Sequence, residues 1–126
     1  MRITADRLND DTLESSTTSG LTAATDFTVN SFSGRKLHGI TTVEMFCQYT
    51  GSGVTLVSGN LPDVSMCTLP SGWRPPETIN STWGDGTESG ECTIGTTGIV
   101  SLRSSNLSIP NNRGIRVTAT WISENG

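Results

Sequence analysis

LPSGWRPP, residues 69–76, contains three of the chain's five prolines, and the predicted fold is organised around it. A proline fixes φ near about −65° and removes a backbone donor, so neither a helix nor a regular central strand forms here. The residues before the prolines favour extended geometry, and Gly72 supplies a pivot. We therefore predict a rigid corner between two strands, with Trp73 closing one end of a core. The alternative makes Trp73 and Arg74 an exposed contact surface.

The composition favours one all-β domain. The 126 residues match the size of an ordinary domain, and only 16% of them are charged. Abundant Thr, Ser, Gly and Asn are typical of short strands joined by turns. The net charge is −4 with scattered basic residues, no apolar run approaches a membrane span, and the N-terminus lacks a secretory signal. We therefore expect no nucleic-acid partner, no membrane insertion and folding in a cytosol.

Alternating apolar residues predict the strands. The longest candidate covers residues 37–49, and one of its faces is apolar and predicted to face the core: Val43, Met45, Cys47 and Tyr49. Phe46 lies on the opposite face, which suggests that this face also meets protein, such as another subunit. Further short strands are expected at residues 54–57, 64–69 and 77–83.

The second half of the chain contains the clearest hairpin. Residues 91–94 and 99–103 flank the turn Gly95–Gly98, and residues 115–123 form the last strand, with Trp121 inward and Ile122 outward. The count is about eight short antiparallel strands with no long helix, which is typical of a β-sandwich or jelly roll. We assign this head domain to residues 25–126.

Residues 1–24 are polar and show little periodicity, so they are predicted to form an extended arm. Such an arm is either a frayed terminus or a segment ordered by docking on a neighbouring subunit. The candidate docking residues are Ile3, Arg7, Leu8 and Leu13.

No residue pattern indicates catalysis, a metal or a cofactor. His38 is the only histidine, and no GxSxG motif accompanies it, so a nucleophilic triad is not expected. Asp85, Glu88 and Glu91 cluster around glycines, but their spacing does not follow a calcium loop and their only local aromatic residue is Trp83. We interpret this cluster as a solvated turn and the chain as non-enzymatic.

The cysteines and tryptophans are read mainly as core residues. Cys47, Cys67 and Cys92 lie in separate strand-like runs without a CxxC pair, so we expect reduced, buried thiols; one disulfide with a spare thiol is the alternative. Trp121 is predicted in the core. Trp83, at a strand end, is the tryptophan most expected at the surface, either packing at a rim or stacking on a sugar ring.

Three motifs follow one another in the second half of the chain: LPSGWRPP (69–76), GECTIGTTGIVSL (90–102) and the strand IRVTATWIS (115–123). Their order resembles the C-terminal head domains of bacteriophage tail-fibre and minor tail proteins, and ITADRLN (3–9) is similar to a linker segment of such fibres. The resemblance implies a jelly-roll head, a homotrimer and host attachment from a virion. Because the linker motif lies at residue 3, we expect a small virion component whose arm docks on the tail tip or the capsid.

The expected function is therefore a tail-associated head domain, assembled in the host cytoplasm, that attaches the virion to its host. The alternative is a capsid decoration or head-fibre protein docked through its arm. A host surface glycan is the candidate receptor. Candidate partner contacts lie in two loops: Trp83, Asp85, Glu88, Asn106, Asn111, Asn112 and Arg113. Candidate subunit contacts are Phe46, Trp73, Arg74 and Ile122.

Overall fold

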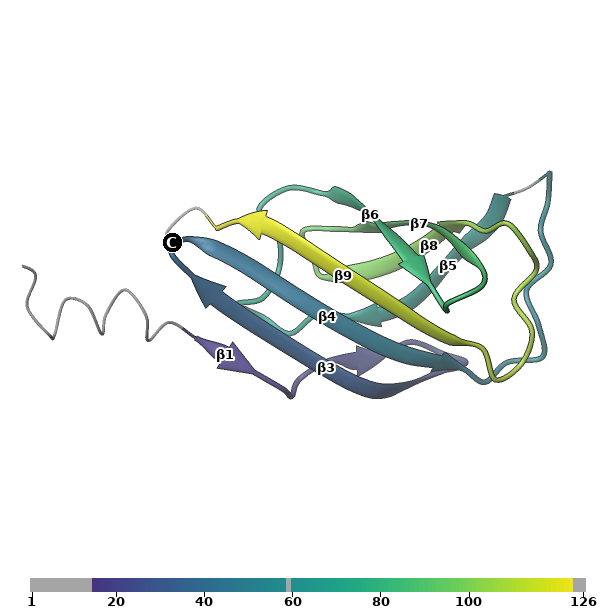
Figure 1. The fold of residues 1–126 in the computed structure, drawn as a ribbon, viewed down its shortest axis with the longest axis horizontal. Coiled ribbons are helices and arrows are strands. Elements are labelled where there is room, and N and C mark those ends of the chain that lie inside the picture. Colours follow the sequence, from purple (N-terminus) through teal and green to yellow (C-terminus); the bar gives the residue numbers. More distant parts are fainter. Residues whose placement is uncertain (1–14, 59, 124–126) are drawn as a thin grey trace, which may run out of the picture.

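In the residues that the structure describes, nine β-strands make up the fold (Figure 1). The structure is a computed structural model that describes residues 15–58 and 60–123. The strands are β1 (Ser16–Thr17), β2 (Thr22–Ala23), β3 (Phe27–Leu37), β4 (Ile40–Tyr49), β5 (Asn60–Thr68), β6 (Ile79–Gly84), β7 (Ser89–Ile94), β8 (Ile99–Ser104) and β9 (Gly114–Ile122). In this described part of the chain, no helix is long and apolar enough to cross a membrane. The predicted docking residues Ile3, Arg7, Leu8 and Leu13 lie outside it.

All nine strands belong to one antiparallel sheet in the order β1-β3-β4-β9-β6-β7-β8-β5-β2. The sheet curls around the core, so that β3, β4 and β9 lie in front of β5 to β8 in Figure 1. Two register pairs, Trp83 with Val117 and Gly84 with Arg116, join β6 to β9 and make the sheet continuous. The all-β prediction is confirmed, whereas the eight-stranded sandwich of two sheets is not, because this pairing links both halves.

The front strands follow the predicted alternation. The inward residues of β4 are all buried, as are those of β9, including Trp121. In β3 the alternation of inward and outward residues is interrupted by a register shift between Val29 and Ser31, which lets both Phe27 and Phe32 face the core. A bulge of this kind moves every later side chain to the other face, and the sequence pattern did not show it.

The β7–β8 hairpin is confirmed, with Cys92 opposite Leu102 and Ile94 opposite Val100. A strand at residues 54–57 was predicted wrongly. This segment makes only isolated bridges, from Val54 to Ile109 and from Val57 to Asn60, and it belongs to no strand of the sheet. Apolar residues in so short a run do not by themselves supply a neighbouring strand to pair with.

The segment before β3 belongs to the same sheet. β1 pairs with β3 and β2 pairs with β5, so residues 16–23 run from one edge of the sheet to the other. Leu21, Ala23 and Ala24 pack against the core. Residues 15–24, assigned from sequence to the arm, therefore cover both sheet edges, which would otherwise expose unpaired backbone groups.

Cys47, Cys67 and Cys92 are free thiols buried in the core, and their predicted burial is confirmed. The Cys67 thiol donates to the Met45 sulfur over 3.7 Å. Burial, together with the nearby Glu91 charge, raises the pKa of Cys92 to about 12. The Cys92 thiol is therefore neutral and unreactive at physiological pH.

Candidate functional site

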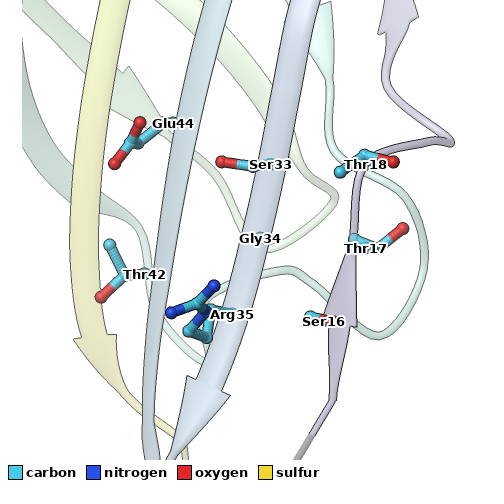
Figure 2. Close-up of a pocket in the computed structure, with 8 residues that line it drawn as sticks. All are labelled: Ser16, Thr17, Thr18, Ser33, Gly34, Arg35, Thr42 and Glu44. Carbon is cyan, nitrogen blue, oxygen red and sulfur yellow. The ribbon is translucent and has the colours of Figure 1, made fainter.

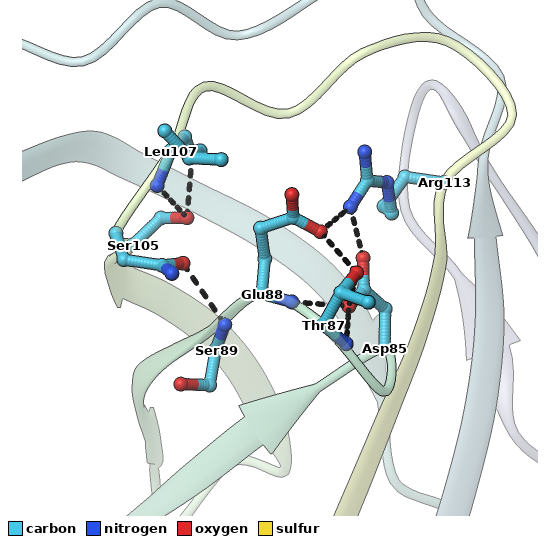
Figure 3. A network of polar contacts seen from close by, with 8 residues as sticks. Asp85, Thr87, Glu88, Ser89, Ser105, Leu107 and Arg113 are labelled. Carbon is cyan, nitrogen blue, oxygen red and sulfur yellow. Dashed lines mark hydrogen bonds and ion pairs between the residues drawn. The ribbon is translucent and has the colours of Figure 1, made fainter.

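The two loops predicted to contact a partner meet at one end of the sheet (Figure 3). One is the turn between β6 and β7, and the other is the connection from β8 to β9. Arg113 links them, because its Nη1 atom donates to both Asp85 Oδ2 and Glu88 Oε2. The exposed fractions of these side chains are 25% for Arg113, 6% for Asp85 and 15% for Glu88. We call these three residues the loop ion cluster.

Asp85 also folds its own turn. Its Oδ1 atom accepts hydrogen bonds from the backbone N–H groups of Thr87 (2.8 Å) and Glu88 (2.6 Å). Burial alone would raise the pKa of the Asp85 carboxyl, but the hydrogen bonds from Thr87 and Arg113 outweigh it and hold that pKa below its ordinary value. The carboxylate is therefore ionised and fully used within the chain.

Arg113 therefore neutralises part of a two-carboxylate cluster, and two negative charges against one positive charge leave a net charge of −1. Both carboxylates are bound to the same guanidinium, an arrangement that stabilises their ionised forms rather than a shared proton. Such a cluster sets the relative position of two loops. In the described residues, no group of three or more His, Cys, Asp or Glu side chains could hold a metal ion.

The three asparagines of the second loop hold it against its neighbours. Asn106 Oδ1 accepts the Ser89 N–H over 3.0 Å, and Asn111 Nδ2 donates to the carbonyls of Thr50 and Gly51 over 3.0 and 2.8 Å. Asn112 adopts φ 70°, a conformation that asparagine tolerates. All three are exposed, so each shapes the loop while presenting part of its surface to solvent.

The prediction of Trp83 as a surface contact is wrong. Its side chain is 2% exposed, and Nε1 donates to the Ser104 carbonyl over 2.9 Å. Gly90, directly opposite in the register, makes room for the indole, since a Cβ atom there would lie 2.7 Å from Nε1. Gly90, across the turn, was the feature of the sequence that could have indicated a buried Trp83. The sequence alone did not show that these two residues lie opposite each other.

The LPSGWRPP corner packs on segments from other parts of the chain. The Trp73 ring lies over Gly34 and 4.7 Å from Lys36 Nζ, and Pro70 lies against Gly20. Arg74 Nε donates to its own corner at the Leu69 carbonyl over 2.9 Å. Trp73 and Arg74, predicted as subunit contacts, thus make these contacts inside one chain.

The other two predicted subunit contacts differ in exposure. Phe46 is half-buried, with the Arg116 guanidinium carbon 4.1 Å from its ring centroid, and the ring lies against Gly114. Ile122 is 77% exposed. Phe46 therefore has an intrachain cover, whereas Ile122 presents most of its side chain to solvent.

A polar hollow of about 460 Å³ lies on the outer face of β1, β3 and β4. Figure 2 shows Ser16 and Thr17 on β1, Arg35 on β3, and Thr42 and Glu44 on β4 around it. Its lining side chains supply hydroxyl groups, one cation and one carboxylate. Sequence reasoning missed this hollow, because β1 pairs with β3 through residues that had been assigned to the arm.

Compared with models of known protein families and with curated proteins, the chain has no significant match.

Proposed function

We propose that the chain is a non-enzymatic structural protein of a bacteriophage virion, a tail-associated head domain that attaches the particle to its host. The observation that carries the proposal is the contact between the first two motifs that resemble phage heads. The Leu69 N–H donates to the Gly98 carbonyl over 2.8 Å, and Gly98, at φ 89°, leaves room for Arg74. A packed unit of corner and hairpin is a physical reason for the two motifs to occur together in such heads.

In this proposal the curled sheet is the jelly-roll head of a homotrimer, and its receptor is a host surface glycan. The loop ion cluster supports a receptor-binding role, since it joins two loops rigidly and thereby preorganises the surface around them. Asn106, Asn111 and Asn112 supply exposed amide groups on that surface. The loops, rather than the LPSGWRPP corner, are therefore the proposed contact region.

Immunogold electron microscopy tests the proposal. An antibody raised against the purified chain is applied to particles of the phage that encodes it, with particles from a disrupted gene as the control. Gold at the tail, together with lost adsorption in the disrupted mutant, supports the proposal. Gold on the capsid, with normal adsorption and lower particle stability, supports the decoration or head-fibre alternative instead. Particles that contain none of the chain refute both.

A further inference from the structure

Three apolar side chains form a row on the outer face of the sheet, at the end where β3 and β9 finish and β4 begins. Leu37 lies opposite Ile40, and Ile40 lies opposite Ile122, so all three point to the same side. Their exposed fractions are 40%, 46% and 77%. The next row of the same face is polar, with Arg35, Thr42 and Thr120. We call Leu37, Ile40 and Ile122 the apolar row.

A hollow of about 280 Å³ accompanies this row and is lined by Arg35, Leu37, His38, Ile40 and Thr42. Contiguous outward apolar residues of this kind offer a surface that an apolar segment can cover. The hollow lets a covering side chain insert rather than only lie flat. The site therefore suits a short segment with isolated apolar residues.

The first described residues of the chain lie near the row. The Lys36 N–H donates to the Ser15 carbonyl over 2.9 Å, and Ser16 pairs with Arg35. Because β1 runs antiparallel to β3, Ser15 lies at the end of β1 that is nearer Leu37. Figure 1 shows the start of β1 at the same end of the molecule as the tips of β3 and β9.

We propose that residues 3–13 of the same chain cover the apolar row. Apart from Met1, the large apolar residues of the first fourteen are Ile3, Leu8 and Leu13, and the rest are polar or alanine. The row spans two interstrand gaps, roughly 10 Å, which about three extended residues cross. The segment is therefore more than long enough, and its attachment at Ser15 keeps it near the row at an effective concentration on the order of millimolar.

Charge also favours this occupant. Residues 1–14 carry four carboxylates and two arginines, a side-chain charge of −2, and the cationic residue Arg35 is among those that line the hollow. A contact within one chain does not rest on the virion function proposed above. The proposed cover makes Ile122 part of an intrachain contact, so a homotrimer would form through other surfaces.

Methyl NMR on the full chain tests the proposal. The variant Leu8→Ser/Leu13→Ser is compared with wild type, and Thr4→Ser/Thr12→Ser serves as a control in the same segment. We expect the Leu37, Ile40 and Ile122 methyl resonances to shift in the first variant and to stay unchanged in the control. The Leu107 methyls, which are exposed elsewhere, should not move in either variant. Unshifted row methyls in Leu8→Ser/Leu13→Ser would overturn the proposal.

A second measurement separates the chain's own segment from that of a neighbour. Isotope-filtered NOEs are recorded on an equal mixture of labelled and unlabelled protein, so that only contacts between two molecules appear. Shifted row methyls without intermolecular NOEs from Leu8 or Leu13 support the intrachain contact. Intermolecular NOEs between these leucines and Ile122 overturn it in favour of exchange between copies. Because Ile122 and both leucines are read in the folded protein, neither outcome depends on a variant that fails to fold.

Discussion

Removing the charge of Asp85 should destabilise the fold far more than removing the charge of another ion-paired aspartate. In Asp85→Asn, an amide oxygen can still accept from Thr87 and Glu88, but an NH2 group then faces Arg113, which donates to that position in the wild type. The side chain is only 6% exposed, so water cannot replace the lost bond.

The magnitude follows from that geometry. A hydrogen bond to a charged group contributes about 1.5–3 kcal/mol, and the unpaired Arg113 donor adds to the loss of stability. Glu88 still binds Arg113 in the variant, which limits that loss. We expect the free energy of unfolding to fall by about 2–3 kcal/mol. For a chain of this length the melting temperature should then drop by roughly 10 °C.

The effect should also depend on pH with a definite sign. The folded-state pKa of Asp85 is lowered, so its stabilisation is present above the ordinary carboxyl pKa and is lost as the pH falls through the folded-state pKa. The stability difference between wild type and Asp85→Asn should therefore be largest near about pH 7 and narrow below about pH 4.

Urea denaturation at several pH values measures both effects, with Asp63→Asn as the matched control. Asp63 pairs with Arg103 over 2.9 Å, but their side chains are 75% and 52% exposed, so this pair should contribute only about 0–1 kcal/mol. If both variants lose the same stability, or if the Asp85→Asn difference does not narrow in acid, the reasoning about the loop ion cluster is refuted.

Two further variants test the packing. Gly90→Ala should destabilise the chain by about 1–3 kcal/mol, because the new Cβ would lie 1.8 Å from the Ser104 carbonyl oxygen. The control Gly95→Ala, in which the atoms nearest the new Cβ lie 4.0 Å away, should melt near wild type. Equal melting temperatures for the two variants would contradict this reasoning. Trp73→Ala should lower the melting temperature, since the ring packs inside the chain and against Lys36. The same variant should leave the sedimentation coefficient unchanged. A shift to smaller species would instead make Trp73 a subunit contact.

Much of the strand content could be predicted because its signal is local. The alternation along β4 and β9 reports burial on one face, and the glycines at 95 and 98 mark the β7–β8 turn within a few residues. The corner at residues 69–76 is equally local, since prolines restrict the backbone wherever they occur. These features need no knowledge of which strands become neighbours.

The candidate site was predicted only in part. Both contact loops were chosen from their turn residues, and the structure brings their charged members Asp85, Glu88 and Arg113 together. Trp83 was misplaced, since its orientation depends on the pairing of β6 with both β7 and β9. The polar hollow and the apolar row were missed because each is assembled from strands that are distant in the sequence.

The sequence alone determined the all-β class, the core faces of β4 and β9, and the rigid corner, because period-two burial and the proline φ constraint act between near neighbours. The tertiary structure was needed to show that the nine described strands form one curled sheet, in which β1 and β2 pair with β3 and β5 at its two ends. It also decided that Trp73 and Arg74 pack within the chain. Each of these depends on register between distant segments, which local preferences do not specify.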